Sequence, residues 1–134
     1  MLQQHPAHPD AKWTLVLGAS DNPTRYSYLA AQRLLTAGHP VTLVGKAGGS
    51  VFGLPIHRTV EEALLAGQLT PHTVTLYLRP EHQQPLYDAL LALKPRRILF
   101  NPGTENPEFE KLAQAAGIEP IEACTLVLLG RGAY

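Results

Sequence analysis

A short apolar segment leads directly into a glycine turn and then into a helical pattern. The apolar segment is residues 13–17, the turn is Gly18-Ala19-Ser20, and the helical pattern begins near Ser27. A glycine at the end of a parallel strand lets the chain turn tightly, and the next helix then points its free backbone N–H groups above the sheet. Because such groups bind phosphate or pyrophosphate, this feature predicts a nucleotide or nucleotide-cofactor binder built on a parallel sheet.

Length and charge restrict the class of protein. The 134 residues suit one domain, and the 11 basic side chains equal the 11 acidic ones, which argues against nucleic-acid binding. The sequence has no apolar run near 18 residues, so we expect no membrane partner, and residues 1–12 lack the apolar core of a signal peptide. The single cysteine, Cys124, fits a reducing cytoplasm. We expect a cytoplasmic protein with a flexible segment at residues 1–12 and a folded domain at 13–134.

Apolar runs and helical patterns alternate along the rest of the chain. The runs are short and almost continuously apolar, as strands buried on both faces are, and they cover residues 14–17, 41–44, 74–78, 97–100 and 118–121. A brief extended piece at residues 54–57 suggests a small additional edge strand. The alternation predicts an α/β fold of three layers, with a five-stranded, mostly parallel sheet between helices.

The helical segments have recognisable starts and stops. The first is expected at residues 27–37 with Gly38 as its stop, and Thr59 and Glu62 have the spacing of a capping box ahead of a short helix. Apolar spacing predicts a helix at residues 81–93, which Pro85 interrupts, and another through residues 109–116. The apolar tail at residues 126–129 is expected to form a final helix or strand.

Four loops follow the ends of expected strands, at residues 18–25, 45–53, 79–81 and 101–105. In an open α/β sheet, ligands bind outside these carboxyl ends, where the strand order reverses. The first loop is not a full dinucleotide fingerprint, because Ser20 and Pro23 stand where the second and third glycines would be. A purely structural turn therefore stays open beside the binding interpretation.

The loop after the second strand discriminates between nucleotide ligands. An NAD site of the usual type needs a carboxylate there, and the chain instead has Gly45-Lys46-Ala47. Lys46 would attract a ribose phosphate, which occurs in NADP and in coenzyme A; the alternative is a solvated loop lysine. The six histidines show no metal-ligand spacing, so no metal site is expected.

Together these motifs resemble the CoA-binding domain family, a stand-alone relative of the N-terminal CoA-binding domain of the succinyl-CoA synthetase α subunit. The resemblance spans about residues 12 to 130. It rests on motifs in matching order, namely Gly18-Ala19-Ser20-x-x-Pro23, Arg25-x-Ser27, Gly38-His39-Pro40-Val41, Gly53-Leu54-Pro55, Arg79-Pro80-Glu81, Asn101-Pro102-Gly103 and Cys124. Two stretches depart from the family pattern, the Gly45-Lys46-Ala47 stretch and Asn101-Pro102-Gly103.

The resemblance implies a Rossmann-like fold that holds coenzyme A across the strand ends. The implied contacts to CoA fall on Gly18, Ala19, Ser20, Pro23, Arg25, Ser27, Lys46, Arg79, Pro80, Asn101, Pro102 and Gly103. Among these, the turn and Ser27 would approach the phosphates, and Lys46 would lie at the adenosine end. Arg79 and Pro80 would border the adenine or pantetheine groove, and residues 101–103 would line the next part of the cleft.

Relatives that do chemistry carry a phosphorylated histidine in a second domain, and no histidine of this chain matches it. The leading hypothesis is therefore a non-catalytic protein that binds coenzyme A or an acyl-CoA as a carrier, a sensor or a subunit. The alternatives are an NADP-binding oxidoreductase-type domain, or a protein-interaction module with an empty nucleotide pocket. A protein partner or a homodimer is left open. Cys124 is expected to be either an inert packed thiol or a redox thiol that forms a mixed disulfide with CoA.

Overall fold

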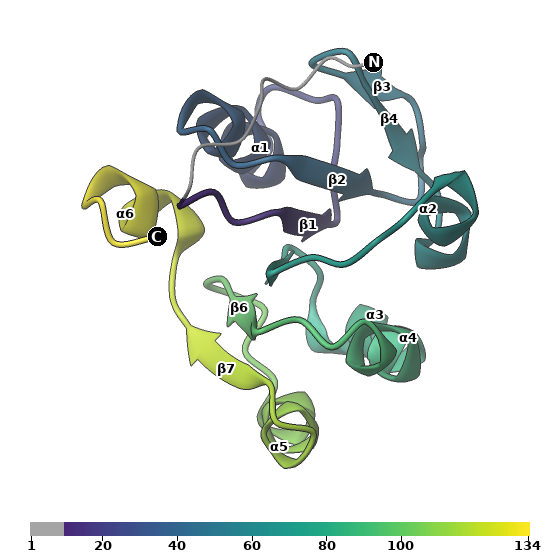
Figure 1. Cartoon of the computed structure of the whole chain (residues 1–134), viewed down its shortest axis with the longest axis vertical. Coiled ribbons are helices and arrows are strands. Elements are labelled where there is room, and N and C mark those ends of the chain that lie inside the picture. Colours follow the sequence, from purple (N-terminus) through teal and green to yellow (C-terminus); the bar gives the residue numbers. More distant parts are fainter. Residues whose placement is uncertain (1–9) are drawn as a thin grey trace.

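The structure, a computed structural model, describes residues 10–134, which form one sheet flanked by helices on both faces (Figure 1). The sheet has seven strands in the order β3-β4-β2-β1-β5-β6-β7. Their bounds are β1 Thr14–Leu17, β2 Val41–Val44, β3 Ser50–Val51, β4 Leu54–His57, β5 Thr73–Leu76, β6 Arg97–Phe100 and β7 Glu119–Glu122. All pairings are parallel except that of β3 with β4.

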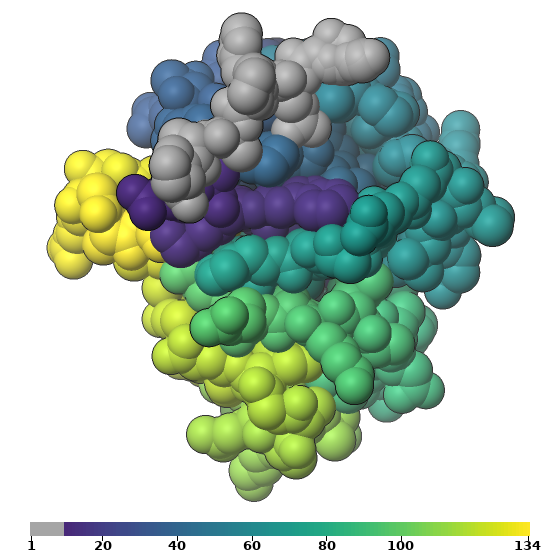
Figure 2. Space-filling view, viewed as in Figure 1, coloured from purple at the N-terminus to yellow at the C-terminus, as the bar shows by residue number. Residues whose placement is uncertain are grey.

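The strand β1 lies in the middle of the sheet and pairs with β2 on one side and β5 on the other. Leu17 at its end is in register with Val44 of β2 and with Leu76 of β5. Figure 2 shows the purple segment around β1 lying between blue segments above and teal and green segments below. The chain forms β2, β3 and β4 on one side of β1 and then β5, β6 and β7 on the other, so the strand order reverses beside β1. This arrangement is Rossmann-like and confirms the expected α/β fold.

The expected number of five strands is wrong, because residues 50–57 add a hairpin to the sheet. β4 is the extended piece expected at residues 54–57, and the two-residue strand β3 lies outside it as the actual edge. Phe52 and Gly53 join them with positive φ angles of 55° and 74°, as a tight hairpin turn requires. A strand of two residues is too short to produce a detectable apolar run.

Two sets of helices cover the two faces of the sheet (Figure 1). On one face α1 (Tyr26–Thr36) packs beside α6 (Thr125–Gly130). The other face buries side chains of α2 (Val60–Ala66), α4 (Tyr87–Ala92) and α5 (Pro107–Ala115) against β1, β5 and β6. The three expected layers are therefore present.

The ends of the helices follow the expected local signals. Thr59 caps α2, since its side-chain oxygen accepts from the Glu62 N–H at 3.0 Å. The segment expected at residues 81–93 is interrupted near Pro85, as α3 (Pro80–Gln83), a 3₁₀ turn (η1, Gln84–Leu86) and then α4. The apolar tail forms a helix, α6.

Two expectations concern the chain as a whole. The flexible segment expected at residues 1–12 falls mostly on residues 1–9, outside the described part of the chain. None of the helices within residues 10–134 combines the length and the apolar character that crossing a bilayer requires.

Candidate functional site

A cavity of about 480 Å³ lies at the carboxyl ends of β1, β2 and β5, where the strand order reverses. Four segments that are distant in the sequence form its walls. The lining residues are Leu17 to Ser20 and Arg25, Val44 to Ala47, Arg58 to Glu61, and Tyr77, Leu78, His82 and Leu86. This is the position at which open α/β sheets bind their ligands.

The first two loops cross in close backbone contact. The N–H groups of Gly18 and Ala19 both donate to the carbonyl oxygen of Val44, at 2.9 and 3.0 Å. Gly18 has a φ of +86°, and a Cβ there would lie 2.8 Å from the Tyr77 carbonyl oxygen. A Cβ on Gly45 would lie only 2.1 Å from the Ala19 carbonyl oxygen. Glycines are therefore required on both loops, and they bring bare backbone to the cavity.

Side chains within the loop before α1 fix its course. The hydroxyl oxygen of Ser20 accepts from the Asn22 N–H at 3.0 Å, and the amide oxygen of Asn22 accepts from the N–H and the hydroxyl of Thr24 at 3.0 and 2.8 Å. Of the residues expected here, Gly18, Ala19, Ser20 and Arg25 line the cavity. Pro23 is exposed and Ser27 is buried, and neither lines it.

The charge around the cavity is mainly positive. Arg25, Lys46 and Arg58 contribute three cations to the lining, and Glu61 is the acidic residue among the lining side chains. All four are exposed to solvent. The other lining residues include apolar ones such as Leu17, Val60 and Leu86. A cavity with this balance attracts anionic ligands that also carry an apolar part.

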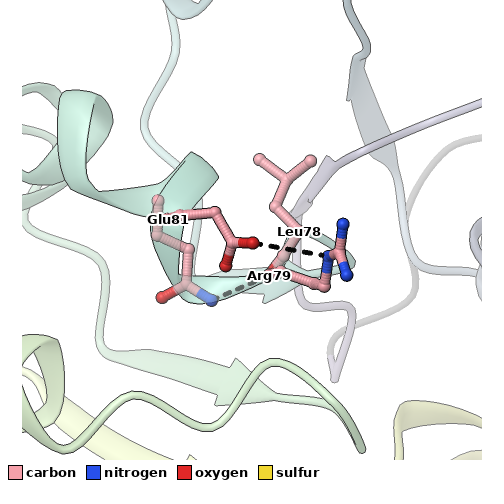
Figure 3. A network of polar contacts seen from close by, with 4 residues as sticks. Leu78, Arg79 and Glu81 are labelled. Atoms are coloured by element: carbon pink, nitrogen blue, oxygen red, sulfur yellow. Dashed lines mark hydrogen bonds and ion pairs between the residues drawn. The ribbon is translucent and has the colours of Figure 1, made fainter.

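The loop after β5 contributes Leu78 to the cavity but turns Arg79 away from it. Arg79 forms an ion pair with Glu81, Nε to Oε2 at 3.7 Å, and both side chains are largely exposed (Figure 3). The carbonyl oxygen of Leu78 accepts from Nε2 of the fully buried Gln83 at 2.7 Å, which fixes the loop. Pro80 begins α3 and does not line the cavity either.

The loop after β6 is also expected to contact a ligand, but its amide side chain is used internally. Asn101 is buried, and its Nδ2 donates to the Thr75 hydroxyl at 2.7 Å and to the Leu76 carbonyl at 2.9 Å. Its Oδ1 accepts from the Thr125 N–H at 2.8 Å. Asn101 therefore ties β6 to β5 and to the start of α6. Pro102 and Gly103 are exposed, and none of the three residues lines the cavity.

Cys124 and Tyr77 lie where α6 begins, on the sheet face that α1 and α6 cover. Cys124 is half-buried, immediately precedes α6 and does not line the cavity. Tyr77 lines it, and burial is the main reason that the pKa of its hydroxyl is raised to about 12. That hydroxyl lies near those of Thr125 and Thr75, but it forms no hydrogen bond of good geometry with any residue among 10–134. Tyr77 is therefore neutral at physiological pH.

Sequence reasoning missed several lining residues, most importantly Arg58 and His82. Arg58 follows β4 directly, so the rule that selected the other strand-end loops would have found it. Residues 54–57 have the pattern of only a small edge strand, so the sequence does not draw attention to the loop that follows them. His82 lies on α3 one turn after Leu78, and no sequence signal distinguishes it from the other histidines. Among residues 10–134, no group of three metal-ligating side chains could hold a metal ion.

Comparisons with known proteins agree with this architecture. An uncharacterised protein of known crystal structure is 43% identical, with a TM-score of 0.80, over 92% of this chain and 98% of that one. A Thermus thermophilus protein, cell-free ID.343, is 26% identical, with a TM-score of 0.79, over 92% and 91% of the two chains. A hypothetical protein from Pyrococcus horikoshii OT3, 22% identical with a TM-score of 0.80 over 91% and 84%, supports the fold alone.

No curated protein matches the chain. The CoA binding domain family, in contrast, matches residues 12–130, which include every strand, the glycine crossing and all the residues that line the cavity. The chain therefore belongs to the CoA binding domain family.

Proposed function

We propose that this protein binds coenzyme A or an acyl-CoA in the cavity at the strand ends and does not itself catalyse a reaction. The observation that carries the proposal is the cavity itself, which combines bare glycine backbone, three cations and an apolar wall at the switch point of the sheet. Coenzyme A has the corresponding parts, namely a diphosphate, a ribose phosphate and a long pantetheine arm. Membership of the family supports the choice of ligand.

The expected contact residues divide into two groups under this proposal. Gly18, Ala19, Ser20 and Arg25 line the cavity before α1, where the helix N-terminus favours the diphosphate. Lys46 lines it at the end of β2. The remaining residues proposed from the family resemblance lie outside the cavity, and they would meet only a part of the ligand that extends beyond it. These are Pro23, Ser27, Arg79, Pro80, Asn101, Pro102 and Gly103.

An NADP-binding domain of the oxidoreductase type is the second candidate. The residues after β2 are Gly45-Lys46-Ala47, so no carboxylate follows this strand to accept bonds from an unphosphorylated ribose. This favours a phosphorylated ribose over NAD, but the phosphate can be that of NADP or that of coenzyme A. The choice between them therefore needs a direct measurement.

Titration calorimetry with CoA, acetyl-CoA, NADP and NAD in one buffer tests the proposal. Micromolar affinity for CoA or acetyl-CoA without dinucleotide binding is the expected result. Preference for NADP would overturn the choice of ligand. The absence of heat from all four ligands, checked by an orthogonal assay such as thermal shift, would favour a protein-interaction module with an unused cavity.

Replacing Lys46 with alanine is expected to weaken CoA binding by about five- to tenfold, because the ribose phosphate then loses a charged partner. Dephospho-CoA lacks that phosphate, so its affinity should change less than twofold. Calorimetry of both ligands gives the two ratios. Lys111→Ala, at an exposed position of α5 outside the cavity, is the matched control. An equal loss for both ligands would remove Lys46 from the phosphate-binding role.

A further inference from the structure

We propose that Arg58, which lies across the backbone of Gly48, determines specificity by selecting ligands whose ribose carries a phosphomonoester. The inference rests on the proposed function and deepens it. It assigns a role to a cavity residue that follows β4, beside the lining residues that follow β1, β2 and β5.

The backbone of Arg58 is fixed by the first turn of α2. Its N–H donates to Oε1 of Glu62 at 3.0 Å, while Thr59 caps the helix through the Glu62 N–H at 3.0 Å. The residue before it, His57, is in register with Val44 and accepts from the Gly45 N–H at 2.8 Å. The starting point of the Arg58 side chain is therefore set by the sheet and by α2 together.

The side chain then crosses the loop that carries Lys46. A Cβ added to Gly48 would lie 3.1 Å from Nε of Arg58 and 3.3 Å from both Cγ and Cζ. The Arg58 side chain therefore lies directly against the backbone of Gly48, and a methyl group there would force it to shift by a few tenths of an ångström. Nη1 of Arg58 also makes a long contact, 3.5 Å, with the carbonyl oxygen of Lys46. The Arg58 guanidinium therefore lies beside the backbone of Lys46, and both residues line the cavity.

Their arrangement leaves positive charge and hydrogen-bonding capacity available. Within residues 10–134, the contact with Lys46 is the one hydrogen bond that the Arg58 guanidinium makes, although this group has five N–H donors. Glu61 is the acidic residue of the lining, and among the described residues it forms no ion pair with Arg58 or Lys46. An anion bound beside the guanidinium would use these donors and would be attracted by both Arg58 and Lys46.

A phosphomonoester suits this pair better than other anions do. A planar guanidinium binds two phosphate oxygens at once, and a lysine adds a mobile point charge. The diphosphate of a nucleotide cofactor would instead lie at the glycine turn before α1. A separate phosphate site beside Arg58 therefore corresponds to the ribose phosphate, which dephospho-CoA and NAD lack.

Small nucleotides test this site without requiring the rest of the cofactor. The wild-type protein is expected to bind adenosine 3′,5′-bisphosphate at least tenfold more tightly than adenosine 5′-monophosphate in calorimetry. Arg58→Gln should reduce that ratio by about tenfold while the affinity for the monophosphate changes less than twofold. Adenosine 2′,5′-bisphosphate, measured in parallel, distinguishes a CoA-type phosphate from the NADP type.

Gly48→Ala gives a second test that leaves every charge in place. The new methyl group displaces the guanidinium, so the ratio should fall although Arg58 is intact. Gly53→Ala is the matched control, because Gly53 also has a positive φ, +74° against +69° for Gly48, but nothing lies within 4 Å of its Cβ position. Both alanines are placed at a similar positive φ, and only the first lies against Arg58. Thermal unfolding with and without nucleotide confirms that the compared variants are folded.

The outcomes separate this inference from the proposed function. CoA binding by the wild type together with an unchanged ratio in Arg58→Gln would overturn the role of Arg58 and leave the proposed function standing. Preference for a bisphosphate that depends on Arg58, in a protein that does not bind CoA, would do the reverse. Equal loss of monophosphate and bisphosphate binding would also overturn the inference. A wild type that binds neither nucleotide nor CoA would overturn both.

Discussion

Replacing Gly45 with alanine will lower the free energy of unfolding by about 2–3 kcal/mol, the range expected for overpacking a closely fitted site. The new Cβ would lie 2.1 Å from the carbonyl oxygen of Ala19 and 3.0 Å from its carbon. Neither loop can move away easily, because Gly45 donates to His57 at 2.8 Å and Ala19 donates to Val44 at 3.0 Å. Relief of the clash therefore sacrifices backbone hydrogen bonds, and urea unfolding measures the loss.

Gly130→Ala is the control for this experiment. Gly130 ends α6, has no atom within 4 Å of its Cβ position and does not need a positive φ. Alanine there should be neutral or slightly stabilising, because it favours the helical conformation. A Gly45→Ala protein that unfolds at the wild-type urea concentration would show that the two loops do not need this close approach.

Replacing Asn101 with alanine will also destabilise the protein, by about 3 kcal/mol. The substitution removes three hydrogen bonds, which join the Asn101 side chain to the Thr125 N–H, the Leu76 carbonyl and the Thr75 hydroxyl. All four residues are buried. A buried polar group gives up its hydration when the protein folds. Without its hydrogen bond, nothing compensates for that loss, and the folded state is destabilised. Chemical denaturation of the variant measures the effect.

Gln114→Ala removes a comparable amide from an exposed position of α5 and should change stability by less than 0.5 kcal/mol. Similar stabilities for the two variants would contradict the structural role of Asn101. Calorimetry of the folded Asn101→Ala protein adds separate information on the ligand. A loss of CoA affinity would support the contact that the family resemblance implies, whereas unchanged affinity would limit Asn101 to its role in stability.

The central strands could be predicted from the sequence because the sheet buries both of their faces. The expected segments 14–17, 41–44 and 97–100 coincide with β1, β2 and β6. The segment expected at 74–78 extends past the end of β5, since Tyr77 and Leu78 continue the apolar pattern after the strand has ended. Both residues line the cavity and also pack against the core, so an apolar residue at a strand end can form part of a cavity wall.

Only those parts of the candidate site that depend on local sequence could be predicted. Glycine after a strand located the crossing of the first two loops, and the strand-end rule placed Lys46 at the cavity. The direction of a side chain depends on its tertiary partners, so the inward hydrogen bonds of Asn101 and the position of Arg58 over Gly48 could not be predicted. These two residues are ten or more positions away in sequence from the groups that orient them.

The cavity draws all its lining from residues 17 to 86, although the sheet continues through β6 and β7. The segment after Leu86 therefore supports the half of the sheet that carries the cavity without lining it. Hydrogen–deuterium exchange should show this division, with ligand slowing amide exchange mainly in the loops after β1, β2, β4 and β5. For the same reason, the last third of the chain is a natural unit to exchange with that of the 43% identical protein, because such a chimera alters the support and keeps the cavity.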